Sequence, residues 1–143
     1  MTTVQQVFDM AIHLMDEQCQ ERGRTIIDDT KEYQFRTISI LNAIMPSLWP
    51  YSDNCDRTYP GRPACPPLTI PEDYADPCFD QFLPLDDALS RGLLPYALAS
   101  HLLAKEDPEL SQWFALRYEK AFLELRDNIP SCFHPIPMPY GSF

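Results

Sequence analysis

The hydrophobic positions of the chain fall into four groups with helical spacing. The first group follows Thr2 and Thr3, either of which can cap a helix. The second follows Asp29 and Thr30, which are candidate caps, and Pro46 is expected to kink this helix or to end it at the residue before. The two apolar stripes are Val4, Val7, Phe8, Ala11, Ile12 and Met15, with Asp9, Asp16 and Glu17 opposite, and then Tyr33, Phe35, Ile38, Ile40, Leu41, Ile44 and Met45.

The third group is the most apolar part of the chain. From Asp86 to Lys105 nearly every face of the predicted helix is apolar, which is typical of a buried helix. Its uninterrupted apolar part, Gly92–Ala99, is too short to cross a bilayer, since a span needs about 20 residues.

The fourth group predicts a second long helix packed against the third group. Asp107 can cap it, and Pro108 suits its first position. Because the connection Glu106–Asp107 is short, we expect the two helices to form an antiparallel hairpin. The last helix is expected to end near Asn128 or Ile129. Its aromatic residues are expected in the core, and they are Trp113, Phe114, Tyr118 and Phe122.

Two segments are rich in proline. Residues 51–84 contain seven prolines, which remove backbone donors and exclude a long helix or a central strand. Residues 130–143 have proline at alternating positions, which favours extended polyproline backbone. Apolar side chains of the first segment can dock on the helices, and these are Tyr51, Tyr59, Leu68, Ile70, Tyr74, Phe79 and Phe82.

These patterns together predict an all-α protein. The expected architecture is a small four-helix bundle, a helical hairpin plus two further helices, with a long proline-rich loop and an extended C-terminal tail. We expect a single helical domain over residues 1–129 with the proline-rich insert at about 51–84, followed by the tail at 130–143.

The chain is acidic, with a formal net charge of −10. Such a surface disfavours non-specific attraction to nucleic acid or to an anionic membrane, although an acidic wall lets a duplex slide past. Between residues 51 and 90, eight acidic side chains against two arginines give a balance of −6. These acids are Asp53, Asp56, Glu72, Asp73, Asp76, Asp80, Asp86 and Asp87.

The cysteines and histidines form no recognisable catalytic or metal motif. Five widely spaced cysteines fit reduced structural thiols, and the absence of a signal-peptide pattern predicts a cytosolic setting. Cys132 and His134 form a C-x-H pair, but the close cysteine pair usual in structural zinc sites is missing. His101, in the apolar hairpin, is expected to be a core or interface histidine. We therefore expect no catalytic residue, no metal and no cofactor.

Several aromatic and apolar residues have no helical stripe of their own. They either pack on their own domain or contact a neighbouring chain. Exposing a stiff, apolar, extended tail to water is unfavourable, and binding it to a partner loses little conformational entropy. The candidate partner-binding residues are Trp49, Tyr51, Phe133, Ile136, Met138, Tyr140 and Phe143.

The hairpin LDDALSRGLLPYALASHLLAKEDPELSQWFALRYEKAFLEL, residues 85–125, resembles head-to-tail connector (neck adaptor) proteins of prophages and tailed phages. The string Asp29-Thr30-Lys31-Glu32-Tyr33 is similar to the start of their second helix. The loop at 54–84 and the tail depart from the family's pattern. The resemblance implies an α-helical, non-enzymatic protomer that forms a homo-oligomeric ring beneath the portal. DNA would pass through its centre without sequence-specific binding.

The resemblance also implies where the protein works and with what. Its partners would be copies of itself and portal or other neck and tail proteins, with no membrane contact. It would be cytoplasmic during assembly and lie at the head–tail junction of the mature virion. Two other hypotheses remain open. One is a small cytosolic regulatory or adaptor protein that binds a protein through its C-terminal tail. The other is a metal-dependent enzyme or a metal-binding module built on Cys55, Cys65 and Cys78 with Cys132 and His134.

Overall fold

The structure is a computed structural model, and it describes residues 1–21, 31–55, 64–73 and 75–128. Within these residues the secondary structure is helical, and backbone pairing is limited to two isolated bridges. The helices are α1 (Val4–Glu21), α2 (Lys31–Leu48), the 3-10 turn η1 (Trp49–Tyr51), α3 (Asp87–Gly92), α4 (Leu94–Leu103) and α5 (Pro108–Asn128). The predicted all-α class is confirmed.

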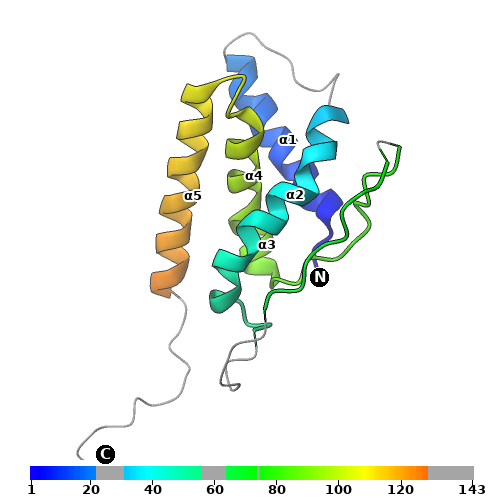
Figure 1. Cartoon of the computed structure of the whole chain (residues 1–143). Coiled ribbons are helices and arrows are strands. Elements are labelled where there is room, and N and C mark those ends of the chain that lie inside the picture. Colours follow the sequence, from blue (N-terminus) through cyan, green and yellow to red (C-terminus); the bar gives the residue numbers. More distant parts are fainter. Residues whose placement is uncertain (22–30, 56–63, 74, 129–143) are drawn as a thin grey trace, which may run out of the picture.

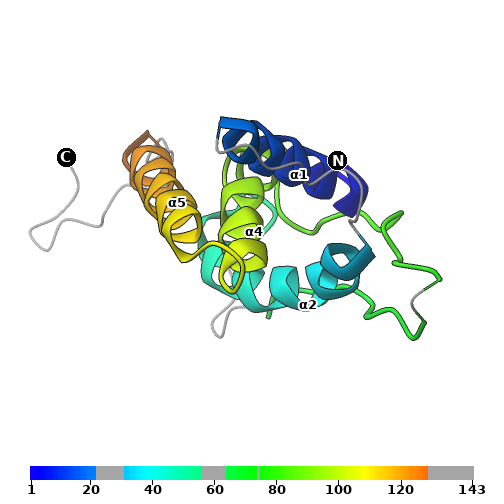
Figure 2. The ribbon, with the colours of Figure 1, turned by 90° about the horizontal axis from the view of Figure 1, so that it is seen from above.

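Helix α4 lies at the centre of the bundle. The two views show α1, α2 and α5 arranged around it, with the short α3 at its lower end (Figures 1 and 2). Along the chain the four long helices run alternately up and down in Figure 1. The side chains of Leu94, Leu98, Ala99 and Leu102 have no exposed surface. The apolar character of α4 on all its faces is explained by this enclosure.

The first arm of the hairpin is two helices, whereas the sequence pattern predicted one. Helix α3 ends at Gly92, and Leu93 connects it to α4 with φ −118° and ψ −45°. Pro95 causes this break, because its ring would clash with the carbonyl of Arg91 in a continuous helix. It occupies the first turn of α4, where its missing N–H costs nothing.

The second arm begins and ends as predicted. The carboxylate of Asp107 accepts a hydrogen bond from the Leu110 N–H at 3.1 Å, so Asp107 is the N-cap of α5. Further along the hairpin, the hydroxyls of Ser100 and Ser111 each donate to the other residue's carbonyl, at 2.9 and 2.7 Å. Because serine side chains are small, this pair lets α4 and α5 approach closely. Helix α5 ends at Asn128.

Helix α1 begins with a capping box. The Gln6 N–H donates to the Thr3 hydroxyl at 3.3 Å, and the Thr3 N–H donates to the Gln6 side chain at 3.0 Å. All six residues of the predicted apolar stripe are buried. Asp16 was expected on the polar face, but it is 7% exposed. The polar face of α1 is therefore narrower than the sequence pattern indicated.

Helix α2 continues past Pro46 to Leu48, so the expected end of the helix at this proline is wrong, and the alternative of a kink there stays a prediction. Leu48 is fully buried, and its packing holds the last turn in place despite the missing donor of Pro46. Phe35, assigned to the apolar stripe, is 41% exposed. The expected caps Asp29 and Thr30 lie outside the described residues.

The proline-rich loop packs on the start of α1 and the side of α2. The first N–H groups of α1, which have no partner within the helix, are satisfied by it, because Val4 donates to the Gln81 carbonyl and Gln5 to the Phe79 carbonyl, each at 3.0 Å. The centre of the Phe79 ring lies 5.0 Å from the centre of the Phe8 ring.

The expected docking of loop side chains is confirmed in part. Leu68 and Phe79 are buried, whereas Ile70 and Phe82 are 60% and 57% exposed. Tyr59 and Tyr74 lie outside the described residues.

Candidate interaction surfaces

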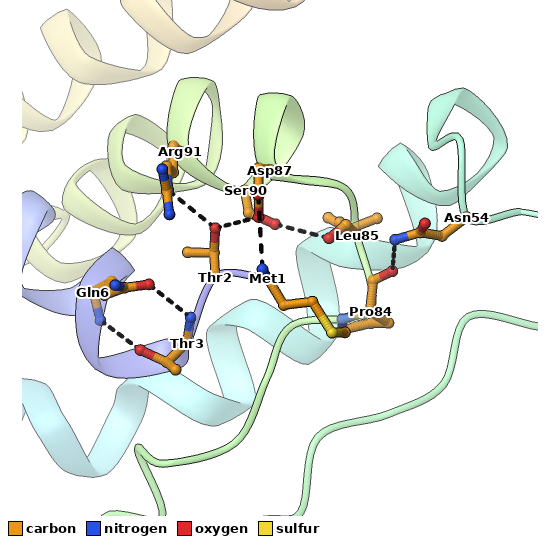
Figure 3. Close-up of polar contacts among 10 residues, drawn as sticks. All are labelled: Met1, Thr2, Thr3, Gln6, Asn54, Pro84, Leu85, Asp87, Ser90 and Arg91. Atoms are coloured by element: carbon orange, nitrogen blue, oxygen red, sulfur yellow. Dashed lines mark hydrogen bonds and ion pairs between the residues drawn. The ribbon is translucent and has the colours of Figure 1, made fainter.

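A polar network joins the N-terminus to α3 (Figure 3). Thr2 is fully buried, and its hydroxyl donates to the Asp87 carboxylate at 2.7 Å while it accepts from the Arg91 Nε at 3.2 Å. The hydrogen bond from Thr2 is the main cause that lowers the pKa of Asp87, and nearby positive charges act in the same direction. The Met1 amine lies 3.8 Å from the same carboxylate.

The neighbouring Asp86 extends this network to the loop after α2. Its carboxylate accepts from the Ser52 hydroxyl at 3.0 Å, and its N–H donates back to that hydroxyl at 3.3 Å. The Asn54 amide donates to the Pro84 carbonyl at 2.8 Å (Figure 3). The side chains of Thr2, Ser52 and the two aspartates are thus used in holding α1, α3 and the loop together. We interpret the network as structural.

Two hollows lie along the same side of the α3–α4 segment. The first, about 270 Å³, is lined by α1 on one side and by α3 and α4 on the other, with Met10, His13, Leu14, Glu17, Arg91 and Tyr96 among its residues. The second, about 240 Å³, lies between the α3–α4 junction and α5, and is lined by Ala88, Gly92, Leu93, Ala121, Glu124 and Leu125. We refer to the two hollows together as the α1/α5 groove.

A third hollow of about 270 Å³ lies between α2, α4 and α5. It is lined mainly by small residues, including Ala43, Ala97 and Ser100, with Tyr118 and His101 beside them. The side chain of His101 is exposed, which excludes the core half of the expectation, and the alternative of an interface histidine stays a prediction. Burial raises the pKa of Tyr118, and a hydrogen bond with Ser47 opposes that shift.

The candidate partner-binding residues divide into two groups. Trp49 is 9% exposed and packs in the core. Tyr51 is half-buried, and its ring centre lies 5.2 Å from that of Phe122 in an edge-to-face arrangement. Both therefore pack on their own domain. The other five, Phe133, Ile136, Met138, Tyr140 and Phe143, lie outside the described residues.

The aromatic residues of α5 are at the core or its margin. Phe114 is fully buried, and Trp113, Tyr118 and Phe122 are half-buried. The Arg117 guanidinium lies 4.8 Å from the centre of the Trp113 ring.

The sequence pattern did not identify two exposed apolar residues on α5. Leu116 and Leu123 are 58% and 40% exposed. Their spacing of seven residues puts both on the side of the helix that faces away from α4. The sequence did contain a sign of this exposure, because both leucines fall outside the apolar stripe made by Leu110, Phe114 and Tyr118.

The four cysteines that the structure describes are not joined in disulfide bonds. Cys19 and Cys55 are buried, Cys65 and Cys78 are half-buried, and burial raises the pKa of the Cys65 thiol. Across the ranges that the structure describes, His, Cys, Asp and Glu side chains form no group of three or more that could hold a metal ion. Cys132 and His134 lie beyond the described part of the chain.

None of the helices in the described ranges combines the length and the apolar character needed to cross a membrane. Comparisons with protein-family models, curated proteins and solved structures found no match. The surfaces described above and the resemblance of residues 85–125 are the grounds for a functional proposal.

Proposed function

We propose that this protein is a non-enzymatic virion assembly protein of the head-to-tail connector type. It works as a subunit of an oligomeric ring between the portal and the tail. The segment that resembles such proteins, residues 85–125, includes the central helix α4 and most of the edge helix α5.

The observation that carries the proposal is the outer face of α5. This helix packs on α4 at the edge of the bundle (Figure 2). Leu116 and Leu123 are exposed on the face of α5 away from that contact. Two large apolar side chains exposed on an edge helix favour contact with another chain. In the proposed ring, this face lies against the next subunit or the portal.

The charge of the protein supports the same proposal. Glu72, Asp73, Asp76 and Asp80 are exposed on the proline-rich loop, and the net charge is −10. Like charges repel DNA phosphates, so a ring with acidic walls lets a duplex pass without holding it. The proposed protein is cytoplasmic during assembly and becomes part of the head–tail junction, with no membrane contact.

Electron microscopy of the concentrated protein, alone and with a portal protein from the same gene cluster, tests the proposal. We expect ring-shaped particles, and we expect Leu116→Glu to reduce their number while far-UV circular dichroism stays unchanged. A chain that remains monomeric with the portal, encoded outside a phage structural cluster, would contradict the proposal. A monomer alone would not, because some ring proteins assemble only on their template.

A second candidate is a regulatory or adaptor protein that binds a partner through residues 130–143. It is favoured by the apolar composition of this segment, which follows directly after α5. Under this alternative, removal of residues 130–143 abolishes binding to one host protein and leaves the helices folded, and no ring forms under any condition.

A further inference from the structure

The two hollows of the α1/α5 groove have neighbouring residues of α3 in their linings. Ala88, Arg91 and Gly92 are all exposed, and their spacing of three and four residues puts them on one face of this helix. Ala88 and Gly92 line the hollow next to α5, and Arg91 lines the hollow next to α1. This face of α3 therefore lies between the two hollows. Helix α1 lines the first hollow and α5 lines the second, and Figure 2 shows these two helices on either side of α4.

The groove has apolar walls and a charged rim. Met10 is 38% exposed on the α1 wall, and Leu14 and Tyr96 are half-buried beside it. On the α5 wall, Ala121 and Leu125 are half-buried. The charged residues of the lining are Glu17, Arg91 and Glu124. An apolar interior with polar groups at its edge is typical of a site that receives a peptide segment.

The C-terminal segment of the chain matches this groove in chemistry. Residues 129–143 contain four prolines, three of them at the alternate positions 135, 137 and 139. They also carry large apolar side chains and no Asp, Glu, Lys or Arg. Proline-rich extended segments bind apolar and aromatic grooves because little conformational entropy is lost on binding. Tyr96 supplies an aromatic surface for such a segment.

The length and origin of this segment also fit. Asn128, the last residue of α5, is three positions beyond Leu125, which lines the groove. At about 3.1 Å per residue, the 15 residues that follow Asn128 reach roughly 45 Å. The 21 residues of α5 span only about 31 Å. The segment is thus longer than α5 and can extend well beyond the end of its own helix toward an adjacent copy.

Entry into the groove of the same chain is less favourable. The chain would have to reverse its direction directly after Asn128. Ile129 precedes Pro130, and a residue before proline is restricted to extended backbone.

We propose that the α1/α5 groove of one copy binds residues 133–143 of a second copy. The inference rests on the proposed function, because it describes a contact between subunits of the ring. The contact joins two different surfaces, a segment and a groove, and is therefore heterologous. Heterologous contacts produce closed rings when the rotation between copies closes.

Photo-crosslinking of the full-length chain tests this docking. Tyr140 is replaced by benzoylphenylalanine, and equal amounts of 15N-labelled and unlabelled protein are mixed at the highest soluble concentration and irradiated. We expect mass spectrometry to find crosslinks from position 140 to peptides containing residues 10–17 or 88–96. These crosslinks should join a labelled chain to an unlabelled one.

A pair of matched substitutions separates docking in the groove from accidental contact. A Cβ at Gly92 has no neighbouring atom within 4 Å, so Gly92→Leu fills the groove without a backbone clash. We expect it to lower the crosslink yield about tenfold, which corresponds to about 1.4 kcal/mol of binding free energy. The control is Ala43→Leu, which also creates a leucine and adds one carbon fewer, in the hollow between α2, α4 and α5. It should leave the yield unchanged.

The inference is overturned if crosslinks join positions within one chain only, map outside the groove, are absent, or persist in Gly92→Leu. Rings seen by electron microscopy together with any of these results would reject the docking and leave the connector proposal intact. Any of these results together with a chain that stays monomeric with the portal and is encoded outside a phage structural cluster would reject both.

Discussion

The hydroxyl of Thr2 connects a carboxylate and a guanidinium from a helix that begins 85 residues later in the chain. Because Thr2 is fully buried, its hydroxyl could not bond to water in the folded protein if these two hydrogen bonds were missing. Such a buried hydroxyl contributes to folding stability because its removal leaves other polar groups without a hydrogen-bond partner. The N-terminal residue Thr2 therefore helps to hold α3 in place.

Thr2→Val keeps the shape of the side chain and removes its hydroxyl. We expect the free energy of unfolding to fall by about 1 kcal/mol, the net contribution of a typical hydrogen bond, because Asp87 and Arg91 lose this partner but are exposed to water. Urea denaturation followed by circular dichroism measures the change. Thr2→Ser retains the hydroxyl and should lose less than about 1 kcal/mol. Equal losses for the two variants would show that packing of the methyl group, and not the network, stabilises this corner.

Tyr33 gives a prediction about pH. Its hydroxyl donates to the Glu106 carboxylate, and burial followed by this hydrogen bond raises the pKa of Tyr33 well above the ordinary value of 10.0. An unfolded tyrosine ionises near that value, whereas the folded one stays protonated. The stabilisation by Tyr33 is therefore complete below pH 10.0 and is lost as the pH rises above it.

We expect Tyr33→Phe to lose about 1 kcal/mol of unfolding free energy at neutral pH, because the hydrogen bond is gone. The variant should also show a weaker loss of stability than the wild type above about pH 10. Urea midpoints measured from neutral to alkaline pH test both effects. The slope that remains is attributed to other residues, including Tyr118, whose pKa is raised as well. Identical alkaline slopes for the two proteins would contradict this role of Tyr33.

At the scale of the elements, the sequence predicted the features that depend on close neighbours along the chain. The caps at Thr3 and Asp107 bond to residues three positions away, so their spacing is visible in the sequence. The break at Leu93 was missed because the apolar pattern runs through it without interruption. Gly92 and Pro95 were the signal, since a proline three residues after a glycine favours a new helix start.

The features that depend on distant residues were not predictable in this way. The α1/α5 groove exists only because α1 and α5 take opposite sides of α4 (Figure 2), which no local pattern specifies. Trp49 and Tyr51 have no helical stripe, and their burial depends on contacts such as that with Phe122. The docking of the proline-rich loop likewise depends on polar contacts between residues far apart in the sequence.

Asn42 makes the contact that holds this loop to α2. Its amide donates to the Leu68 carbonyl at 3.1 Å, and its oxygen accepts from the Leu68 N–H at 2.8 Å. Asn42→Ala removes both bonds, and we expect the Leu68 amide to exchange with solvent at least about tenfold faster, as for a loss of about 1.4 kcal/mol in local stability. Hydrogen exchange by NMR measures this rate.

Asn42→Asp is the matched variant for this contact, because it keeps the acceptor for the Leu68 N–H and loses the donor. Its exchange rate should lie between those of the wild type and Asn42→Ala. Helix content should be the same in all three proteins, because the contact lies outside the helical backbone bonds. An unchanged Leu68 rate in Asn42→Ala would mean that burial of the Leu68 side chain alone holds the loop.

At the scale of the whole molecule, the net charge and the apolar surfaces have opposite effects on self-association. A charge of −10 on every copy repels its neighbours at low ionic strength. The proposed contacts, by contrast, are apolar, since they use Leu116, Leu123 and the α1/α5 groove. Salt screens the repulsion and leaves apolar contacts largely unaffected. The balance of the two effects should therefore depend on ionic strength.

We expect the oligomeric fraction to rise when the salt concentration increases from about 50 mM to about 500 mM, because the Debye length becomes shorter than the distance between most charges on adjacent subunits. Sedimentation velocity at constant protein concentration measures this fraction. Leu116→Glu should lower the fraction at both salt concentrations, because it removes an apolar contact and adds a negative charge to each copy. If salt dissociates the oligomer instead, ion pairs hold the subunits together. The apolar faces of α5 and of the groove would then not be the surfaces through which this acidic protein assembles.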